Sequence, residues 1–576
     1  MRVVRRSTSL KSVDPLRRPR SLDPHELGFT PRRAVPWLAP LLLLRTGLRS
    51  LLATIFGAYL DKRELQGALP SRTFRQNGTD GEIWLDYVAD LGDGFDATYT
   101  VAYLLGQPSL TVDGHQLPRG QVLIMGGDQA YPTASMQEYE DRCKGPYTAA
   151  LPTAPVDGPQ PTLYALPGNH DWYDGLTAFL RVFVGERTDH IGGWRIEQSR
   201  SYFALELPHS WWVFAVDEAF GAYLDDPQLV YFEQAARQLG PGHKVILVFP
   251  TPGWTKAERD PKAYDTIDFF IRTIIAPTGA QVRVILAGDT HHYSRYSHPT
   301  RELVTCGGGG AYLAATHTLP ERITVPPQES LVRKASPKRE YDLAACYPAK
   351  ERSRRLGWRV FGRLPRRNRD FLWLLGGVHL VLMLTLAGVL AETTLAEERL
   401  FSIPLALAII TVIGGTVAFA YLPPGGRKGK RHLAAGLAHG GAHLLLGVAG
   451  AVVWLRLPFV DLPWPWPIAL AALLYAPVAA LVASQLLAAY LLVASRFTLN
   501  VNELFAAQGI EDYKSFLRLH VAADGALTIY PIAVDRVCRR WRADPDATRP
   551  DAPWIVPADA DAIRLRLAEP PVTLSW

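Results

Sequence analysis

Acidic, amide and imidazole side chains follow short apolar runs at four places in the chain. They are Asp90 in ADLGDG, Asp128 in GGDQAYP, Asn169 and His170 in GNHD, and Asp289 with His291 in GDTHHY. Hard oxygen ligands mixed with imidazole suit divalent Mn, Fe or Zn. Two such ions, bridged by a carboxylate such as Asp128, bind a phosphate group and lower the pKa of a bridging water. The residues therefore indicate two-metal chemistry on a phosphoester.

The elements that must position these side chains lie between about 82 and 313. There, short runs rich in Val, Ile and Leu, such as QVLIMGGD and KVILVFPTPG, alternate with helical patterns. Continuous apolar runs bounded by Gly, Asp and Pro predict buried strands covered by helices. The polar residues fall at the carboxyl ends of these runs, where loops of layered α/β folds converge on ligands. An α/β fold is predicted.

Three segments in order, GGD, then GNHD after an apolar strand, then Gly-x-x-His after another strand, resemble the calcineurin-like metallophosphoesterase superfamily. The resemblance covers about 82 to 313, and we extend the domain it implies over 76–320. It implies a four-layer αββα sandwich that hydrolyses phosphoesters.

The resemblance also implies a ligand set for two cations. Asp90 and Asp128 would hold the first ion with His291, and Asp128, Asn169 and Asp289 would hold the second. The implied cofactors are two divalent ions drawn from Mn, Fe and Zn.

The same resemblance assigns roles around the metals. His170 would orient the substrate or protonate the leaving oxygen, and Asp171 would fix the tautomer of its ring. Trp172, Tyr173 and Arg295 either line the substrate pocket or simply pack.

The chain departs from the superfamily pattern at three positions. Gly92 stands where a histidine is usual; purple acid phosphatases share this Asp-Leu-Gly form and use a tyrosine matching Tyr131, so either Tyr131 or Asp93 would fill the gap. Pro250 stands where another ligand histidine is expected. Asp289 replaces an imidazole with a carboxylate, which favours a harder ion such as Mn or Mg over Zn. We expect manganese.

Each of these residues also has a structural interpretation. A lone Asp at a strand end more often caps a turn or a helix than binds a metal. His292 is expected to point away from His291 because neighbouring residues on a strand face opposite ways. Asp217 in AVDEAF is expected to be structural.

The N-terminal region, 1–75, is basic, and residues 1–33 within it are rich in Arg, Pro and Ser, which predicts disorder for 1–33. It lacks the apolar run of a signal peptide. An apolar stretch follows from Ala34 to Tyr59, but Arg45 and Arg49 interrupt it. A charge in hydrocarbon is costly, so an amphipathic helix on the membrane surface fits better than a span.

Beyond a basic linker, 321–369, the region 370–497 predicts an all-α membrane domain. Its apolar segments are each long enough to cross about 30 Å of hydrocarbon; they lie at about 371–391, 401–422, 433–455 and 467–495. The last contains Pro477, which predicts a kink or a tilt.

Loop charge predicts the orientation of the membrane domain. The Arg-rich entry and the RKGKR loop are basic and ETTLAEER is acidic, so the positive-inside rule places the 76–320 domain and the C-terminus in the cytoplasm, with the plasma membrane expected. Within the spans, His379, His439 and His443 predict either interhelical hydrogen bonds or a metal or haem site. The segment 498–576 reads as soluble and able to pack on the 76–320 domain.

Composition narrows the partners. The net charge of +6 is modest for 576 residues and is concentrated in Arg-rich blocks, which indicates membrane topology and no nucleic-acid surface. Four scattered cysteines predict reduced thiols. The sequence thus predicts a membrane-anchored metallophosphoesterase acting on a phosphorylated small molecule or lipid. The alternative is a catalytically weak domain that binds a phosphorylated ligand and signals through, or regulates, the membrane domain.

Overall fold

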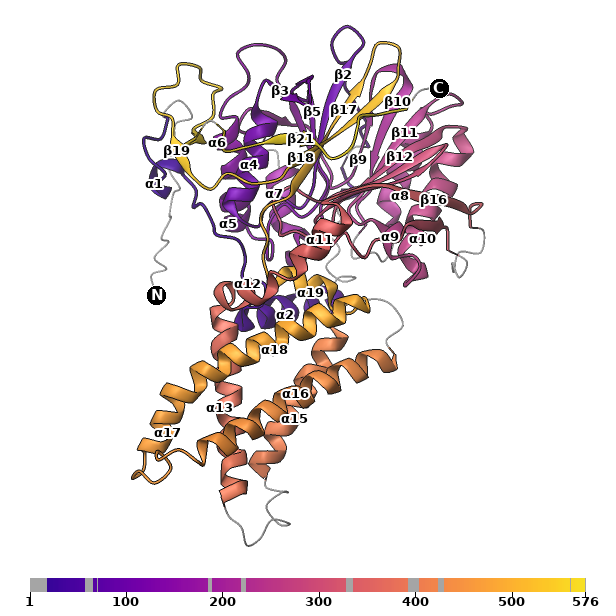
Figure 1. Cartoon of the computed structure of the whole chain (residues 1–576). Helices are drawn as coiled ribbons and strands as arrows, with labels where there is room; N and C mark the ends of the chain where they lie inside the picture. Colours follow the sequence, from indigo (N-terminus) through magenta and orange to yellow (C-terminus); the bar gives the residue numbers. More distant parts are fainter. Residues whose placement is uncertain are drawn as a thin grey trace, which may run out of the picture.

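The computed structural model of the chain describes most of its residues. The described ranges are 18–56, 66–69, 71–184, 189–218, 224–327, 335–391, 403–422, 429–559 and 561–574, without the side chains of 50–56. The fold is mixed α/β, with two large sheets above a helical region (Figure 1). The end of the predicted amphipathic stretch, 57–59, lies outside the described residues.

The first sheet has nine strands and a parallel centre. In spatial order they are β1 (Phe74–Arg75), β9 (Phe203–Glu206), β10 (Trp211–Ala215), β11 (Lys244–Phe249), β12 (Gln281–Ala287), β14 (Arg301–Cys306), β13 (Tyr293–His298), β16 (Arg339–Tyr347) and β15 (Arg322–Val325). β10, β11, β12 and β14 run parallel, so their carboxyl ends share one edge. The predicted linker 321–369 therefore contains two strands of this sheet, β15 and β16.

The second sheet combines the middle of the chain with its C-terminus. Its order is β21 (Leu565–Leu567), β18 (Leu527–Val534), β17 (Lys514–Val521), β2 (Ile83–Val88), β5 (Val122–Met125), β6 (Thr162–Ala165), β8 (Trp194–Ile196) and β7 (His190–Ile191), with β22 (Val572–Leu574) paired to β18. β2, β5, β6 and β8 are parallel, and β17 pairs antiparallel with β2. The segment after the four apolar helices thus belongs to the same sheet as β2, β5 and β6.

A buried ion pair holds this junction. The guanidinium of Arg518 on β17 donates to both carboxylate oxygens of Asp86 on β2, at 2.7 and 3.0 Å. Arg518 is fully buried. A bidentate pair of this kind adds geometric specificity to the strand register.

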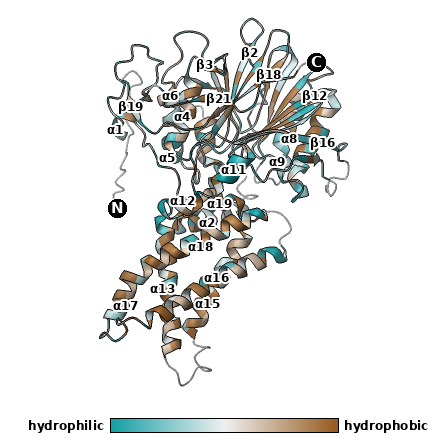
Figure 2. Ribbon diagram, viewed as in Figure 1, coloured by the Kyte–Doolittle hydropathy of each residue, from teal (hydrophilic) through white to brown (hydrophobic). Residues whose placement is uncertain are grey.

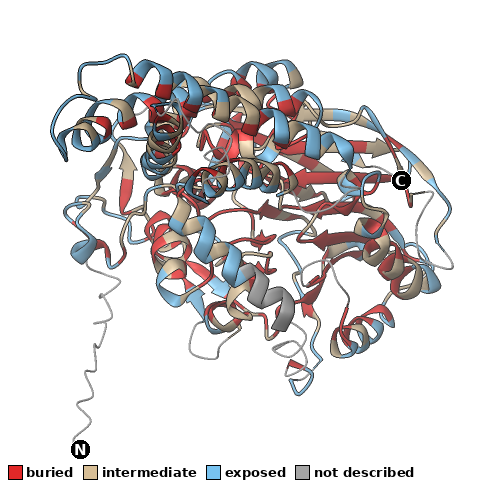
Figure 3. Ribbon diagram, turned by 90° about the horizontal axis from the view of Figure 1, so that it is seen from below, coloured by how far each residue is buried: buried red, intermediate tan, exposed pale blue. Residues whose placement is uncertain are grey.

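Alternating strand residues divide the apolar core. Ile124 of β5 and Ile246 of β11 lie in one cluster, between the sheets. Their neighbours face outward, Leu123 toward a cluster with α4 (Phe95–Gly106) and α7 (Thr177–Phe183), and Leu247 toward one with α8 (Asp226–Ala236) and α10 (Asp265–Phe270). This is the two-residue period of strands buried on both faces. Figure 3 shows the strands buried and the outer helix faces exposed.

Residues 18–33, for which the sequence predicted disorder, are ordered, and residues 1–17 lie outside the described residues. Arg18 donates to the carbonyls of Asp544 and Ala552 in the C-terminal segment, at 2.9 and 3.0 Å. A short helix, α1 (Pro24–Leu27), follows, capped by Asp23. Helix α2 (Pro40–Phe56) then lies between the sheets and the long apolar helices that follow residue 368 (Figure 1).

Two helices after β16, α11 (Lys350–Gly357) and α12 (Val360–Arg367), lead into a group of long apolar helices. Four helices are then long and apolar enough to cross a membrane by length and composition. The structure has them at Arg369–Ala391 (α13), Ile403–Ala420 (in α15, Ile403–Tyr421), Lys430–Trp454 (α16) and Trp466–Arg496. The fourth comprises α17 (Trp466–Leu470), a π-helical turn η8 (Ala471–Tyr475) and α18 (Ala476–Arg496), with Pro477 in the first turn of α18. Figure 2 shows these helices as the most hydrophobic part of the chain.

Glycines and histidines contribute to the packing of the four long apolar helices. A Cβ on Gly436 would lie 2.6 Å from Cα of Val417. The backbones of α16 and α15 are therefore so close at this point that only a glycine fits. His379 of α13 hydrogen-bonds His443 of α16 (2.9 Å), which bonds His439 (3.0 Å). The first contact is an interhelical hydrogen bond, one of the two alternatives that the sequence predicted, whereas the second lies within α16.

Candidate functional site

Three acidic residues end strands on a strained backbone. Asp90 follows β2, Asp128 follows β5 and Asp289 follows β12, and their φ angles are +59°, +54° and +63°. Left-handed conformations are uncommon for residues other than glycine, and such strain clusters at functional sites. It lets each chain turn sharply and present its carboxylate at the sheet edge.

The hydroxyl of Tyr131 is the centre of the cluster. Its oxygen lies 3.1 Å from Oδ1 of Asp90, 3.1 Å from Oδ2 of Asp128 and 3.2 Å from Nε2 of His291. The two aspartates and the tyrosine are buried, and His291 is 8 % exposed. Tyr131, named as a possible ligand from the sequence, thus contacts three other predicted ligands.

Hydrogen bonding leaves this cluster short of positive charge. A phenol carries one proton, so Tyr131 cannot donate to both carboxylates at once. Burial raises the pKa of Asp90 well above its ordinary value, and the charges of Asp128 and Asp289 raise it further. Burial also raises the pKa of Asp128. One oxygen of Asp90, Oδ2, is buried with no partner among the described residues. A cation at this point would relieve all of these costs.

The imidazole of His291 is neutral in this setting. Burial, with the nearby Lys514 ammonium, lowers its pKa to about 3. Neutral imidazole is the form that binds metals. Lys514, the first residue of β17, is itself fully buried and donates to the carbonyl of Ala311, and burial lowers its pKa to about 8. The C-terminal segment thus reaches the back of the site.

His170 stands beside the cluster with one ring nitrogen fixed. Its Nδ1 lies 2.7 Å from the carbonyl oxygen of Pro132, which can only accept, so Nδ1 carries the proton. Its backbone N–H donates to Oδ1 of Asp128 at 2.9 Å, and its ring packs on Tyr131. The expectation that Asp171 fixes this tautomer is corrected, since Pro132 does so.

Asp171 organises the GNHD turn instead. Its side chain is fully buried and accepts from the backbone N–H groups of Gly168 (2.8 Å) and Gln129 (3.4 Å) and from the hydroxyl of Tyr139. It lies at the start of a 3₁₀ turn, η2 (Asp171–Asp174), so its carboxylate turns back toward the loop that it stabilises.

The predicted second cation position is less complete. The backbone N–H of Asp289 donates to Oδ1 of Asp90 at 3.2 Å. Its carboxylate oxygen Oδ2, however, accepts a hydrogen bond from Lys256 Nζ at 2.6 Å. Burial alone would raise the pKa of Asp289, but Lys256 outweighs it and the net shift is downward. The amide nitrogen of Asn169 donates to the Tyr173 hydroxyl at 3.3 Å. Pro250, which follows β11, contributes no ligand atom from its side chain.

Other predicted residues have partners outside the cluster. Arg295 forms ion pairs with Glu302 (2.8 Å) and Glu569 (2.6 Å). The structure therefore does not bring it to the aspartates around Tyr131. Trp172 is buried and donates to Asp217 at 3.1 Å, which agrees with a structural Asp217.

Asp93, the rival of Tyr131, binds the N-terminal segment instead. It accepts from the backbone N–H of Val35 (2.6 Å) and the indole of Trp37 (3.2 Å). Both ring nitrogens of the buried His292 have no partner among the described residues.

Sequence reasoning missed two contributors. Trp37 packs edge-on against Tyr131, His170 and Tyr312, with ring centroids 5.6 to 5.7 Å apart. Lys256 reaches the site from α9 (Gly253–Lys256). Neither residue belongs to a recognisable motif, since one is a lone Trp before an apolar stretch and the other a Lys on a four-residue helix. The one usable signal in the sequence was that Lys256 lies close to Pro250, where the chain departs from the superfamily pattern.

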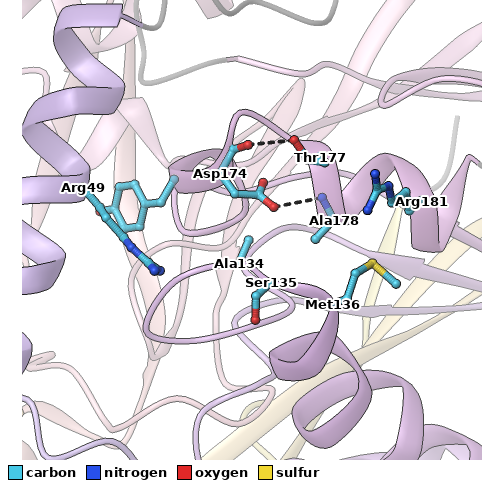
Figure 4. Close-up of a pocket in the computed structure, with 9 residues that line it drawn as sticks. Arg49, Ala134, Ser135, Met136, Asp174, Thr177, Ala178 and Arg181 are labelled. Atoms are coloured by element: carbon cyan, nitrogen blue, oxygen red, sulfur yellow. Dashed lines mark hydrogen bonds between the residues drawn. The ribbon is translucent and has the colours of Figure 1, made fainter. Parts of the chain in front are cut away.

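A hollow of about 420 Å³ opens beside η2. Arg49 from α2 and Arg181 from α7 lie on opposite sides of it, with Tyr173, Met136 and Asp174 among its other lining residues (Figure 4). Tyr173, named for the substrate pocket from the sequence, is therefore adjacent both to Asn169 and to a cavity.

The described part of the chain contains no ready-made group of three His, Cys, Asp or Glu side chains able to hold a metal ion. Asp90, Asp128 and His291 instead converge on the hydroxyl of Tyr131. If the phenol oxygen is counted as a metal ligand, the site offers carboxylate and phenol oxygens with one imidazole, which suits a hard divalent cation. The donor set therefore fits one cation at Tyr131.

The architecture and the site together define a mixed α/β protein with a buried acidic cluster at the sheet edges and four helices apolar enough to span a membrane. No protein-family model matches the chain, and no curated protein sequence matches it either. Two solved structures are similar in part. One is described as GAP50, the anchor in the inner membrane complex of Plasmodium (9% identity, TM-score 0.31, 47% of this chain and 92% of that one). The other is PhoD (11% identity, TM-score 0.26, 40% of this chain and 58% of that one). At these TM-scores neither likeness supports a conclusion about this chain.

Proposed function

We propose that this chain is a membrane-anchored, metal-dependent phosphoesterase with a calcineurin-like four-layer domain. The observation that carries the proposal is the cluster around Tyr131: two buried carboxylates and a buried imidazole share one hydroxyl, and Asp289 adds a third negative charge nearby. A bound cation would offset this negative charge, and the cluster lies at the strand ends that carry the GGD, GNHD and GDTH segments. The helix, sheet, sheet, helix order of the apolar clusters supports the four-layer assignment.

In this proposal Asp90, Asp128, Tyr131 and His291 hold a first divalent ion. Asp128, Asn169 and Asp289 are the superfamily ligands of the second position, although one histidine is missing there. Manganese is favoured because carboxylate and phenol oxygens dominate the set. Bound cations would neutralise phosphate charge and acidify the attacking water.

The chain's own residues then do the positioning and the proton transfer. Because Nδ1 of His170 donates to Pro132, Nε2 is left to accept a proton from water or, once protonated, to donate it to the leaving oxygen. Asp171 holds the GNHD turn through two backbone N–H groups. Trp37 packs edge-on against the ring of His170 and would shield that side of the imidazole from water.

Helix α2 supports a substrate drawn from the membrane. Leu41, Leu44 and Leu48 recur at helical spacing and are 58%, 69% and 54% exposed. The same helix contacts η2, beside His170, and α13, the first membrane helix. An interfacial helix of this kind would place the hollow of Figure 4, with Arg49, at the membrane surface. We propose a phosphorylated lipid or small molecule as substrate, with the site on the cytoplasmic side of the plasma membrane.

The test uses the full chain purified in detergent with added Mn²⁺ and an aryl phosphate. Asp128→Asn should abolish hydrolysis, because it removes the carboxylate shared by both cation positions. Asp217→Asn is the matched control, since Asp217 is also buried but bonds Trp172 and Ser201. Full activity of the Asp128 variant would refute the proposal.

A second candidate function is a weakly catalytic domain that binds a phosphorylated ligand and regulates the membrane helices. The contact of α2 with both η2 and α13 favours it, since it joins the site to the first membrane helix. Saturable binding of inorganic phosphate by a protein that fails to hydrolyse aryl, nucleotide and lipid phosphoesters would support it over the hydrolase.

A further inference from the structure

Lys256 lies where the second cation would be needed. Its Nζ is 2.6 Å from Oδ2 of Asp289, a carboxylate that the superfamily pattern assigns to the second ion. Two ligands of that ion are altered in this chain, since Pro250 replaces one imidazole and Asp289 replaces another. The ammonium therefore stands against the weakest part of the predicted metal site.

A rigid element delivers this ammonium. Lys256 ends α9, which begins three residues after Pro250. A Cβ on Gly253, the first residue of α9, would lie 2.0 Å from the carbonyl oxygen of Ala263, so the helix packs directly on the following 3₁₀ helix η5 (Pro261–Tyr264). The position of Lys256 is set by this packing, and its side chain remains 44% exposed.

The two cation positions differ in how their charge is met. At the first, Asp90 and Asp128 share one hydroxyl proton, and Asp90 Oδ2 has no partner among the described residues. At the second, Asp289 already has a full counter-charge from Lys256. A divalent ion placed beside Asp289 would be repelled by the ammonium and would have to displace it.

We propose that the ammonium of Lys256 takes the place of the second metal ion, so that the loaded protein holds one divalent cation per chain. A phosphate group would then lie between the cation at Tyr131 and the exposed Lys256 ammonium, which is a point-charge phosphate ligand. This inference rests on the proposed function and replaces its two-ion form with a one-ion form.

The test measures metal content, not activity. The full chain in detergent is stripped with a chelator, equilibrated with Mn²⁺, freed of excess ion and analysed by mass spectrometry for manganese per chain. The wild type should retain about one ion, and Lys256→Met, which frees Asp289, should retain about two. Lys256→Arg keeps the charge and should stay at one. Lys262→Met, at an exposed lysine of η5, is the matched control.

Lys256→Met could fail to bind a second ion simply because the position beside Asp289 has too few ligands, and a further variant tests this. Lys256→Met combined with Pro250→His restores an imidazole and should hold two ions. One ion in the wild type and in both Lys256→Met variants would overturn the inference, because the ammonium would not be what excludes the second ion. Two ions in the wild type would also overturn it while leaving the proposed function standing. No bound manganese in any variant would overturn the proposed function itself.

Discussion

Replacing Tyr131 with phenylalanine tests the centre of the site, because one oxygen atom there contacts two carboxylates and an imidazole. In metal-free protein the change removes the hydroxyl that lies 3.1 Å from both Asp90 and Asp128. A buried group left without its partner costs about 1–3 kcal/mol, and more if charged. We expect the metal-free variant to be less stable by about 2 kcal/mol.

The same substitution should weaken metal binding. Removing a residue that only hydrogen-bonds to a metal ligand costs about 10–100-fold in metal affinity. Removing a ligand itself should therefore cost about 100-fold. Wild-type protein at 100 times its Mn²⁺ dissociation constant would be stabilised by about 2.7 kcal/mol, whereas the variant at the same concentration would gain only about 0.4 kcal/mol. Thermal unfolding of the full chain in detergent, with and without Mn²⁺, measures both effects.

Two outcomes separate ligand from packing. A variant that loses stability without Mn²⁺ but keeps the full gain on adding Mn²⁺ would show that the phenol does not bind the ion. An unchanged stability in both conditions would refute the hydrogen-bonding argument as well. Tyr139→Phe is the control, since Tyr139 is a buried tyrosine that bonds Asp171 outside the cluster.

Three further predictions address catalysis, pH and the C-terminal junction. His170→Ala should lower turnover while manganese content stays unchanged, because its ring bonds Pro132; loss of the ion would contradict this. Burial raises the pKa of Asp90 and Asp128, so the folded metal-free protein favours their protonated forms and should lose stability as pH rises above about 4. Saturating Mn²⁺ should abolish that loss in thermal unfolding, and a stability that rises with pH in metal-free protein would contradict it. Arg518→Met should destabilise the chain by about 3–5 kcal/mol in chemical denaturation by leaving Asp86 buried and unpaired, whereas an effect below about 1 kcal/mol would mean that the β17–β2 junction does not depend on the pair.

The convergence of the strand-end side chains was predictable because its signal is local. A buried strand followed by Asp or by GNHD is a pattern within a few residues, and Asp90, Asp128 and His291 do meet around one atom. The four apolar helices were predictable for the same reason, since length and hydropathy are properties of single segments.

Long-range pairing was not predictable in the same way. β17 joins β2 across more than 400 residues, and the ion pair of Arg518 with Asp86 has no mark in either local sequence. Strands β15 and β16 were hidden in a stretch whose Pro and charge content indicated a linker. Asp171 was given the wrong role because the motif shows which residues are adjacent in sequence but not which carbonyl, here that of Pro132, faces the imidazole.

Gly92 and Tyr131 are best understood together. A Cβ on Gly92 would lie 2.1 Å from the carbonyl oxygen of Gln129, so no histidine can stand at that position in this backbone. In the same loop the backbone N–H of Tyr131 donates to the carbonyl oxygen of Gly92 at 3.0 Å. This hydrogen bond fixes the position of Tyr131 relative to Gly92. The close approach that forbids a side chain at Gly92 is therefore also what carries the phenol oxygen to Asp90 and Asp128. It follows that Gly92→Ala should displace Tyr131 and weaken Mn²⁺ binding much as Tyr131→Phe does, and that combining the two changes should cost less than the sum of their separate effects.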